Sequence, residues 1–340
     1  MTGANPPVAP EPHGGRAATG PGVALAWRAD ATGLRTLPPE EAVRAAAARD
    51  GMVWIDIDGC DFDAARRLLE PLRIHPLALE DMVTQVNRPK VDDYGDYLYL
   101  AVHSARWDLP AHPALREIDV LIGRSFLVTY HEGETRSVDA AKRILPRRPE
   151  LLARGPVYLL HFLLDVLVDN YLPITDSIGD QIDELEEEVF RRASPRAHAR
   201  ILRLKRGMAA LRRIVGPQRD TILALTRDEF APIPTEMRPY LRDVFDRLAR
   251  VGDLLDSFRD EVAGLLEMHI SQVSARVNQV IKVLTVVATI TIPLTVITSY
   301  YGMNLKIAAF EWTYGEPYVL GLMVISVLIA WWWIRRSRWM

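Results

Sequence analysis

Two long uncharged segments near the C-terminus constrain the fold more than any other feature of this 340-residue chain. The first runs from Val283 to Leu305 and consists mostly of Val, Ile, Leu and Thr. The second runs from Pro317 to Ile334 and ends in three tryptophans. About 20 helical residues suffice to cross the hydrocarbon core of a bilayer. The segments therefore predict two transmembrane helices, the second over residues 317–334, and a pair of buried core helices is the less favoured alternative.

Charged residues around these segments predict their orientation. Lys282 precedes the first segment and a basic tail, residues 335–340, follows the second. The loop between them, residues 302–316, carries one lysine and two glutamates. Lysine and arginine are concentrated on the cytoplasmic side of membrane proteins. We therefore expect a multi-pass protein of the cell (inner) membrane, with both termini in the cytoplasm and residues 302–316 as an external loop.

Composition narrows the class of protein further. The formal net charge is −3, so no nucleic-acid partner is expected. Cys60 is the single cysteine, which excludes an intramolecular disulfide and a multi-cysteine zinc site. The sequence has no Gly-rich phosphate loop and no nucleophile elbow, so an enzyme is not expected. The first 22 residues contain ten Pro or Gly, and residues 1–23 are expected to form a disordered tail rather than a signal peptide.

Residues 24–150 are predicted to form a cytoplasmic α/β domain. Short apolar or alternating stretches have the character of strands, and helical patterns such as Ala64 to Leu69 lie between them. The expected strands are Met52 to Ile57, Tyr97 to His103, Ile118 to Ile122 and Phe126 to Tyr130.

Residues 151–237 are predicted to form a helical hairpin. Residues 157–190 are expected to be one helix with an acidic face, and a basic helix follows Ser194 and Pro195. One interpretation makes the acidic stripe a cation store and the basic stripe a membrane or nucleic-acid patch. The favoured interpretation is an antiparallel pair with complementary faces. The acidic face consists of Asp165, Asp169, Asp176, Asp180, Asp183 and Glu187.

The next helix is predicted to be unusually long. Pro239 is a favoured first-turn residue, and no further proline follows until Pro293. A continuous helix from Pro239 to Tyr301 would contain 63 residues and measure about 95 Å. We therefore assign residues 238–301 to a stalk helix that continues as the first transmembrane helix.

The first predicted transmembrane helix is rich in hydroxyl groups, and steps of three and four residues define one stripe along it. The stripe is a candidate pore lining, although threonines can also bond to their own helix and small residues favour helix packing in membranes. Two spans cannot enclose a hydrated ion, so a pore requires a homo-oligomer. The stripe consists of Asn278, Ile281, Thr285, Ala288, Ile292, Thr295 and Ser299.

At the end of this helix stands Tyr301-Gly302-Met303-Asn304, and with it the chain resembles the CorA magnesium channel family, within the CorA superfamily of metal ion transporters. The tripeptide is specific here because it directly follows the first of two C-terminal spans. The resemblance covers most of the chain from residue 50. It also rests on Asn278, Val283-Leu284-Thr285, Pro293-Leu294-Thr295, His75-Pro76-Leu77, Leu79-Glu80-Asp81, Arg88-Pro89-Lys90, Leu185-Glu186-Glu187-Glu188 and Arg242-Asp243-Val244.

The resemblance implies an α/β cytoplasmic domain, a long α-helical stalk and two C-terminal transmembrane helices, assembled as a homopentamer in the lipid bilayer. It implies a channel that conducts hydrated Mg²⁺, with Co²⁺ and Ni²⁺ as further candidates, into the cytoplasm down the membrane potential. Gly302, Met303 and Asn304 would form the selectivity filter. Mg²⁺ dehydrates reluctantly, so amide and backbone oxygens that contact its water shell suit rapid passage. Glu311 and Glu316 in the external loop could concentrate cations.

The resemblance further implies that intracellular Mg²⁺ is a regulatory ligand as well as the transported ion. The matching positions are Asp81 with Asp243 and Glu80 with Asp165, placed across the interface between subunits. Carboxylates that face each other repel until a cation bridges them, so Mg²⁺ would hold the channel shut.

Several alternatives stay open at this point. A hydrophobic constriction that closes the pore, the gate, has two candidate positions. The helical stripe predicts Thr285, whereas the family pattern predicts Leu284. A zinc or other transition-metal transporter of the same superfamily is the alternative function, although Met303 favours the magnesium branch. A two-span membrane scaffold or sensor is the alternative from another class. The sequence alone determines neither the number of subunits nor the order of preference for Mg²⁺, Co²⁺, Ni²⁺ and Zn²⁺ as transported ions.

Overall fold

The computed structural model of the protein describes residues 22–84, 88–107, 113–191, 195–227, 229–303 and 314–336. The chain divides into two compact units. Unit 1 comprises residues 1–188 and 196–263, and unit 2 comprises residues 189–195 and 264–340. The predicted tail lies almost wholly outside the described residues, and strand β1 already begins at Val23.

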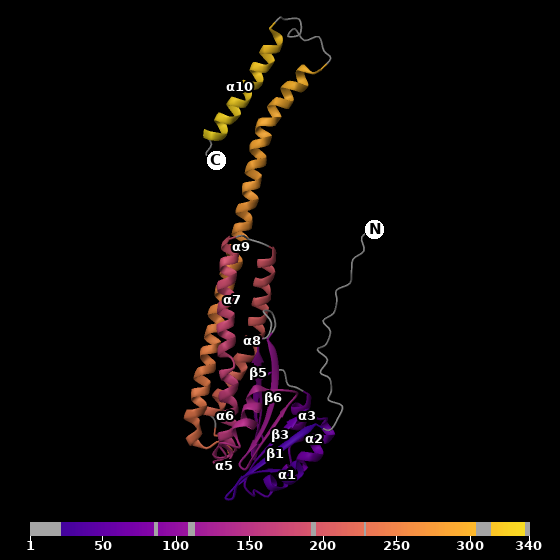
Figure 1. The fold of residues 1–340 in the computed structure, drawn as a ribbon, viewed down its shortest axis with the longest axis vertical. Helices are drawn as coiled ribbons and strands as arrows, with labels where there is room; N and C mark the ends of the chain where they lie inside the picture. The colour runs from indigo at the N-terminus through magenta and orange to yellow at the C-terminus, as the bar shows by residue number, and fades with distance from the viewer. Residues whose placement is uncertain are drawn as a thin grey trace. The chain divides into compact units, whose positions relative to one another are not determined.

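Unit 1 contains a seven-stranded sheet of order β2-β1-β3-β7-β6-β5-β4 among the described residues (Figure 1). β3 and β7 are parallel, with Ile55 opposite Val128, and all other neighbours are antiparallel. The four predicted strands are confirmed, each longer than expected or ending one residue later, whereas β1, β2 and β4 were not predicted. The strands are β1 Val23–Asp30, β2 Gly33–Leu37, β3 Met52–Asp58, β4 Lys90–Asp93, β5 Tyr97–Arg106, β6 Ala114–Gly123 and β7 Phe126–His131.

Helices cover both faces of the sheet, which is why β3 and β7 are buried along nearly their whole length. Helices α1 (Pro39–Ala47), α2 (Phe62–Leu69) and α3 (Pro76–Thr84) cover one face of the sheet. They share one apolar core with strand residues such as Val53 and Ile55, whose side chains lie on the face opposite to Trp54. Helix α6 (Pro156–Asp169) contacts β3, β5, β6 and β7, and none of its residues belongs to that core. Helices α4 (Arg136–Ile144) and α5 (Glu150–Ala153) pack against α6.

A buried polar cluster connects the sheet to α4. Asp56 on β3 is 1% exposed, and one of its oxygens lies 2.6 Å from Lys142 Nζ on α4. Its other oxygen lies 3.3 Å from His131 Nε2 and accepts a hydrogen bond from the Thr129 hydroxyl on β7. The buried carboxylate is thus paired and hydrogen-bonded, the condition under which burial of a charge is tolerated.

The expectation of a single helix over residues 157–190 is wrong. Helix α6 ends at Asp169, and α7 (Leu172–Arg191) begins after Asn170 and Tyr171. Pro173 explains the break, because proline lacks the backbone N–H that would continue the helix and is tolerated only in a first turn. Asp165 and Asp169 therefore lie on a different helix from the rest of the predicted acidic face.

Helices α7 and α8 (Pro195–Arg227) carry complementary charges. Arg200 on α8 donates to Glu188 at 2.6 Å and to Glu184 at 3.1 Å, both on α7. These pairs support the interpretation of complementary faces over that of separate cation and membrane sites.

Helix α9 (Arg238–Tyr301) is uninterrupted over 64 residues (Figure 1). It begins at Arg238, one residue before Pro239, after a short 3₁₀ turn at Thr235–Met237, and contains Pro293 within its length. At 1.5 Å per residue the helix is about 96 Å long. Helix α10 (Gly315–Arg336) has 22 residues and includes the whole of the second predicted span.

Among the described residues, three helical stretches are long and apolar enough to cross a membrane. The stretch Pro156–Arg191, which covers α6 and α7, has more than half of its apolar window buried within the fold, so it belongs to the core of unit 1. The apolar window of α9 contains no buried residue and that of α10 few. The exposed apolar stretches are thus the two that the sequence assigned to the membrane.

Candidate functional site

The threonine hydroxyls of the α9 span bond to their own helix. Thr285, Thr289 and Thr295 each donate to the carbonyl four residues earlier, at 2.8, 2.7 and 2.9 Å. Thr298 donates to Leu294 in the same way, at 3.0 Å. The alternative that these hydroxyls satisfy themselves locally is therefore confirmed for a single chain. Each hydroxyl oxygen keeps lone pairs that can accept a hydrogen bond from water.

One face of the α9 span is partly covered within the chain and the opposite face is open. Val286, Ile290, Pro293, Ile297 and Tyr301 recur at steps of three and four, and all are half-buried. A step of one residue turns the helix by about 100°. The covered residues therefore define one stripe and a direction away from it.

Leu284 and Thr285 lie differently with respect to this stripe. Leu284 is two residues from Val286, so it points roughly 160° away, and it is 67% exposed. Thr285 is one residue from Val286, roughly 100° away, and is half-buried. Leu284 and Thr285 thus lie on either side of the centre of the open face, and Leu284 is the more exposed of the two.

The other residues of the predicted stripe spread around this open face. Thr295 lies two residues from the half-buried Ile297 and is exposed, and Ser299 is exposed as well. Ala288 is half-buried by relative area. Asn278, Ile281 and Ile292 are exposed, the last two with 53% and 61% of their area accessible.

Helix α9 ends at the predicted filter sequence. The Gly302 N–H donates to the Thr298 carbonyl at 2.8 Å, and a Cβ on Gly302 would approach that same oxygen to 2.8 Å. A side chain at this position would therefore require the helix end to shift. Met303 follows and is 51% exposed.

The remaining filter and loop residues are only partly described. Asn304 and Glu311 lie outside the described residues. Glu316 is exposed in the first turn of α10, where the helix dipole favours an acid.

The two acids expected on α3 have different environments. The Glu80 side chain is exposed, whereas Asp81 accepts a hydrogen bond from Lys90 Nζ at 2.6 Å. Lys90 also lies 2.6 Å from Asp92. Partial burial opposes the charge of Lys90, but the hydrogen bonds and charges of Asp81 and Asp92 outweigh it and raise the pKa of this lysine.

The other two expected acids converge on one arginine. Arg247 of α9 forms ion pairs with Asp165 and Asp169 of α6 and, at 3.2 Å, with Asp243 one turn earlier on α9. Burial opposes the charge of Arg247, yet the carboxylates, Asp165 first, raise the pKa of this arginine. His161 lies nearby and burial lowers its pKa.

Lys90 and Arg247 contact the predicted regulatory acids, and the sequence analysis assigned neither of them a place in the site. Arg247 carries a weak local signal, since it follows Asp243 by four residues, the spacing of a helical ion pair. Its partner Asp165 is 82 positions away, and no local pattern predicts that contact. The pairing of Asp81 with Asp243, and of Glu80 with Asp165, across subunits stays a prediction. Within the described part of one chain, no group of three or more His, Cys, Asp or Glu residues is placed to hold a metal ion.

These features define a class: a membrane protein in which a large α/β unit precedes two apolar helices, the first of them continuous with a long stalk. The family of CorA-like Mg²⁺ transporter proteins matches residues 49–336. The chain therefore belongs to this family, whose members are membrane transporters of divalent metal ions and not enzymes.

Individual relatives agree with this assignment. The cobalt/magnesium transport protein CorA of Thermotoga maritima is 35% identical over 291 residues, which cover 84% of this chain and 83% of the relative. The putative metal ion transporter YfjQ of Bacillus subtilis is 30% identical over 287 residues, covering 84% and 89%. The solved structure of the CorA magnesium transporter from Methanocaldococcus jannaschii has a TM-score of 0.78 at 20% identity and covers 94% of this chain and 99% of that one. The fold predicted from the sequence is thereby confirmed.

Proposed function

We propose that this protein is the subunit of a homopentameric channel that conducts hydrated Mg²⁺ into the cytoplasm across the inner membrane, with both termini cytoplasmic. The observation that carries the proposal is the open face of α9, an exposed apolar and hydroxyl-bearing stripe on a helix of membrane length. When copies of the helix surround an axis, such a face can turn inward and line a narrow pore whose apolar rings exclude water. Moving two charges through 100 mV supplies about 4.6 kcal/mol, so no ATPase is needed.

The filter is assigned to Gly302, Met303 and Asn304. Amide oxygens of Asn304 from each subunit would accept hydrogen bonds from the water shell of Mg²⁺. Glu311 and Glu316 would raise the local cation concentration outside the filter.

The pore lining is assigned to the face that carries Leu284. The pore lining comprises Leu284 and the stripe defined from the sequence, which consists of Asn278, Ile281, Thr285, Ala288, Ile292, Thr295 and Ser299. Apolar rings at Ile281, Leu284 and Ile292 would close the pore by excluding water, while hydroxyl oxygens at Thr295 and Ser299 would accept hydrogen bonds from the hydrated ion. The greater exposure of Leu284 favours it over Thr285 as the gate.

We call the regulatory site that closes the channel the brake. It is assigned to Glu80, Asp81, Asp165 and Asp243, with intracellular Mg²⁺ as the regulatory ligand. Lys90 and Arg247 add a step to this proposal. In a single chain Lys90 pairs with Asp81, and Arg247 pairs with Asp243 as well as with Asp165 and Asp169, so Mg²⁺ has to compete with a lysine and an arginine for these carboxylates. Asp243, whose side chain is 70% exposed, is the more accessible of the two.

The filter assignment is tested in proteoliposomes with an imposed negative internal potential. Purified wild type should take up Mg²⁺, and Asn304→Ala should lose selective uptake while keeping its oligomer size, because no other amide stands at this end of α9. Zn²⁺ uptake measured on the same preparation tests the transition-metal alternative. Normal Mg²⁺-selective uptake by Asn304→Ala would contradict the filter assignment, and absence of any divalent-ion flux by wild type would favour a scaffold or sensor.

A further inference from the structure

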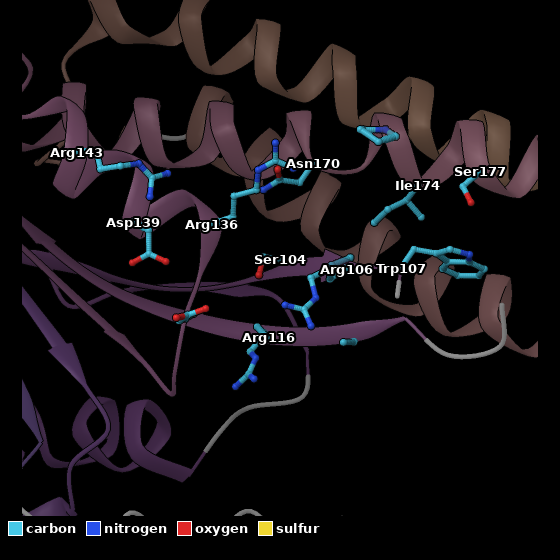
Figure 2. Close-up of a pocket in the computed structure, with 14 residues that line it drawn as sticks. Ser104, Arg106, Trp107, Arg116, Arg136, Asp139, Arg143, Asn170, Ile174 and Ser177 are labelled. Carbon is cyan, nitrogen blue, oxygen red and sulfur yellow. The ribbon is translucent and has the colours of Figure 1, made fainter. Parts of the chain in front are cut away.

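A cavity of about 440 Å³ in unit 1 has no role in ion conduction as proposed above. It lies at the ends of β5 and β6, beside α4 and the start of α7 (Figure 2). Cavities of this size commonly hold small organic ligands. The polar side chains that carry the argument are Ser104, Arg106, Arg116, Arg136, Arg143 and Asn170.

The lining is strongly cationic. Four arginines face two acids, Glu134 and Asp139. No carboxylate pairs with Arg116, Arg136 or Arg143 within the described parts of the chain. Arg116 instead donates Nη1 to the Glu132 carbonyl at 2.7 Å, which fixes the direction of its guanidinium group. The cavity thus concentrates positive charge at Arg116, Arg136 and Arg143 that carboxylates of the described residues do not neutralise.

Two buried polar side chains point to a ligand independently of the arginines. Ser104 and Asn170 line the cavity and are each 8% exposed. Neither side chain has a hydrogen-bond partner in the described structure. The indole Nε1 of Trp107, also in the lining, is a buried donor without a partner among the residues that the structure describes. Buried polar groups are nearly always hydrogen-bonded, so the Trp107 donor marks a place where a partner binds, and Ser104 and Asn170 present further polar groups to the same cavity.

The chemistry of the unpaired groups specifies the ligand. Guanidinium, amide, hydroxyl and indole groups all donate hydrogen bonds, and phosphate oxygens accept several at once. Trp107, Pro173 and Ile174 add an apolar wall. Glu134 and Asp139 can accept hydrogen bonds from hydroxyl or amino groups of the same molecule.

We propose that this cavity binds a small organic phosphate of the nucleoside triphosphate class. The phosphate groups lie against the arginines, Ser104 and Asn170, and the nucleoside lies against Trp107, Pro173 and Ile174. This site is separate from the proposed pore and brake, and its occupancy does not depend on either.

The test is equilibrium dialysis of radiolabelled ATP against the full-length protein in detergent. EDTA is present throughout, so that ATP cannot bind through Mg²⁺ held by carboxylates. Wild type should show one saturable site per chain. Unlabelled ATP should displace the label best, tripolyphosphate less well, and adenosine or inorganic phosphate least.

Paired charge reversals locate the site. Arg136→Glu with Arg143→Glu should weaken ATP binding at least 100-fold, because each change replaces a donor with a repelling carboxylate. Arg66→Glu with Arg67→Glu, on exposed positions of α2, is the matched control with the same change in net charge and should bind ATP like wild type. Arg136→Gln changes one exposed side chain only and should weaken binding about tenfold, even if the double variant does not fold.

Three outcomes would overturn the proposal. The first is absence of saturable ATP binding by folded wild type at millimolar concentration. The second is equal weakening by the cavity and control variants, which would show non-specific attraction to positive charge. The third is equal competition by inorganic phosphate and ATP, which would identify an anion site with no place for an organic ligand.

Discussion

The same apolar residue types have opposite environments in the two units. Val53, Trp54 and Ile55 on β3 have no exposed area, because helices cover both faces of the sheet. On α9, Leu284 and Val296 are 67% and 62% exposed. Hydrophobic burial in unit 1 is completed within one chain, whereas the α9 span requires lipid or other copies of itself. Substitutions at the two places should therefore affect different properties.

The largest effect on folding is expected from Ile55→Ala. This change removes three buried carbon atoms from the sheet core and should cost about 2–5 kcal/mol of unfolding free energy. Leu284→Ala, on the open face of α9, should leave the melting temperature of unit 1 within a degree or two. Thermal unfolding of both variants, followed by circular dichroism in detergent, measures the difference. A similar loss for both would contradict the comparison.

A smaller loss is expected from Asp56→Asn, which leaves Lys142 and His131 without their carboxylate partner. Loss of hydrogen bonds to charged groups should cost about 1.5–3 kcal/mol. Burial opposes ionisation of Asp56, but His131, Lys142 and Thr129 outweigh it and lower its pKa. Burial likewise opposes protonation of His131, but Asp56 outweighs it and raises its pKa.

These shifts predict the pH dependence of stability. The contribution of Asp56 is present above its unfolded pKa of about 3.9 and is lost as pH falls through the lower folded value. The contribution of His131 is present below its unfolded pKa of about 6.5 and is lost as pH rises through the higher folded value. Urea denaturation of wild type and Asp56→Asn between pH 3 and pH 9 measures both. Parallel profiles for the two proteins would remove Asp56 from the explanation.

Asp243→Ala is expected to act on the brake and hardly on the fold. The variant should conduct at internal Mg²⁺ concentrations that close wild type, with the inhibitory concentration raised about tenfold, equivalent to about 1.4 kcal/mol. Asp243→Lys should respond less to Mg²⁺ altogether, because its fixed charge replaces the ion. Asp246→Ala, an exposed acid on the same helix, is the matched control. Equal inhibition of Asp243→Ala and Asp246→Ala by Mg²⁺ would place the regulatory site elsewhere.

The sequence predicted the parts of the fold that depend on local patterns. The start of α9 followed from Pro239, its continuity from the absence of proline before Pro293, and its length from an expected end at Tyr301, whereas four strands followed from dense β-branched and aromatic residues. The missed strands lack that signal: β2 and β4 are short edge strands, and β1 is rich in alanine. The break after Asp169 was missed because apolar periodicity continues through it, although Pro173 marks it.

The candidate site was predictable only in its individual residues. Gly302 and Met303 could be identified from the sequence, and the structure adds the close contact that requires glycine at the helix end. The ion pairs of Asp81 with Lys90 and of Asp165 with Arg247 depend on tertiary packing. The direction of the open face could not be predicted from the sequence either, because it depends on which residues of α9 the rest of the chain covers.

The central claim is that the open face of α9 lines the pore and that Leu284 on this face closes it. The most direct measurement is Mg²⁺ flux into proteoliposomes at high internal Mg²⁺ for wild type, Leu284→Asn and Thr285→Asn. A polar ring at the constriction favours the wet, conducting state. Leu284→Asn should therefore leak while wild type and Thr285→Asn stay closed. A closed Leu284→Asn channel together with a leaking Thr285→Asn channel would contradict the account.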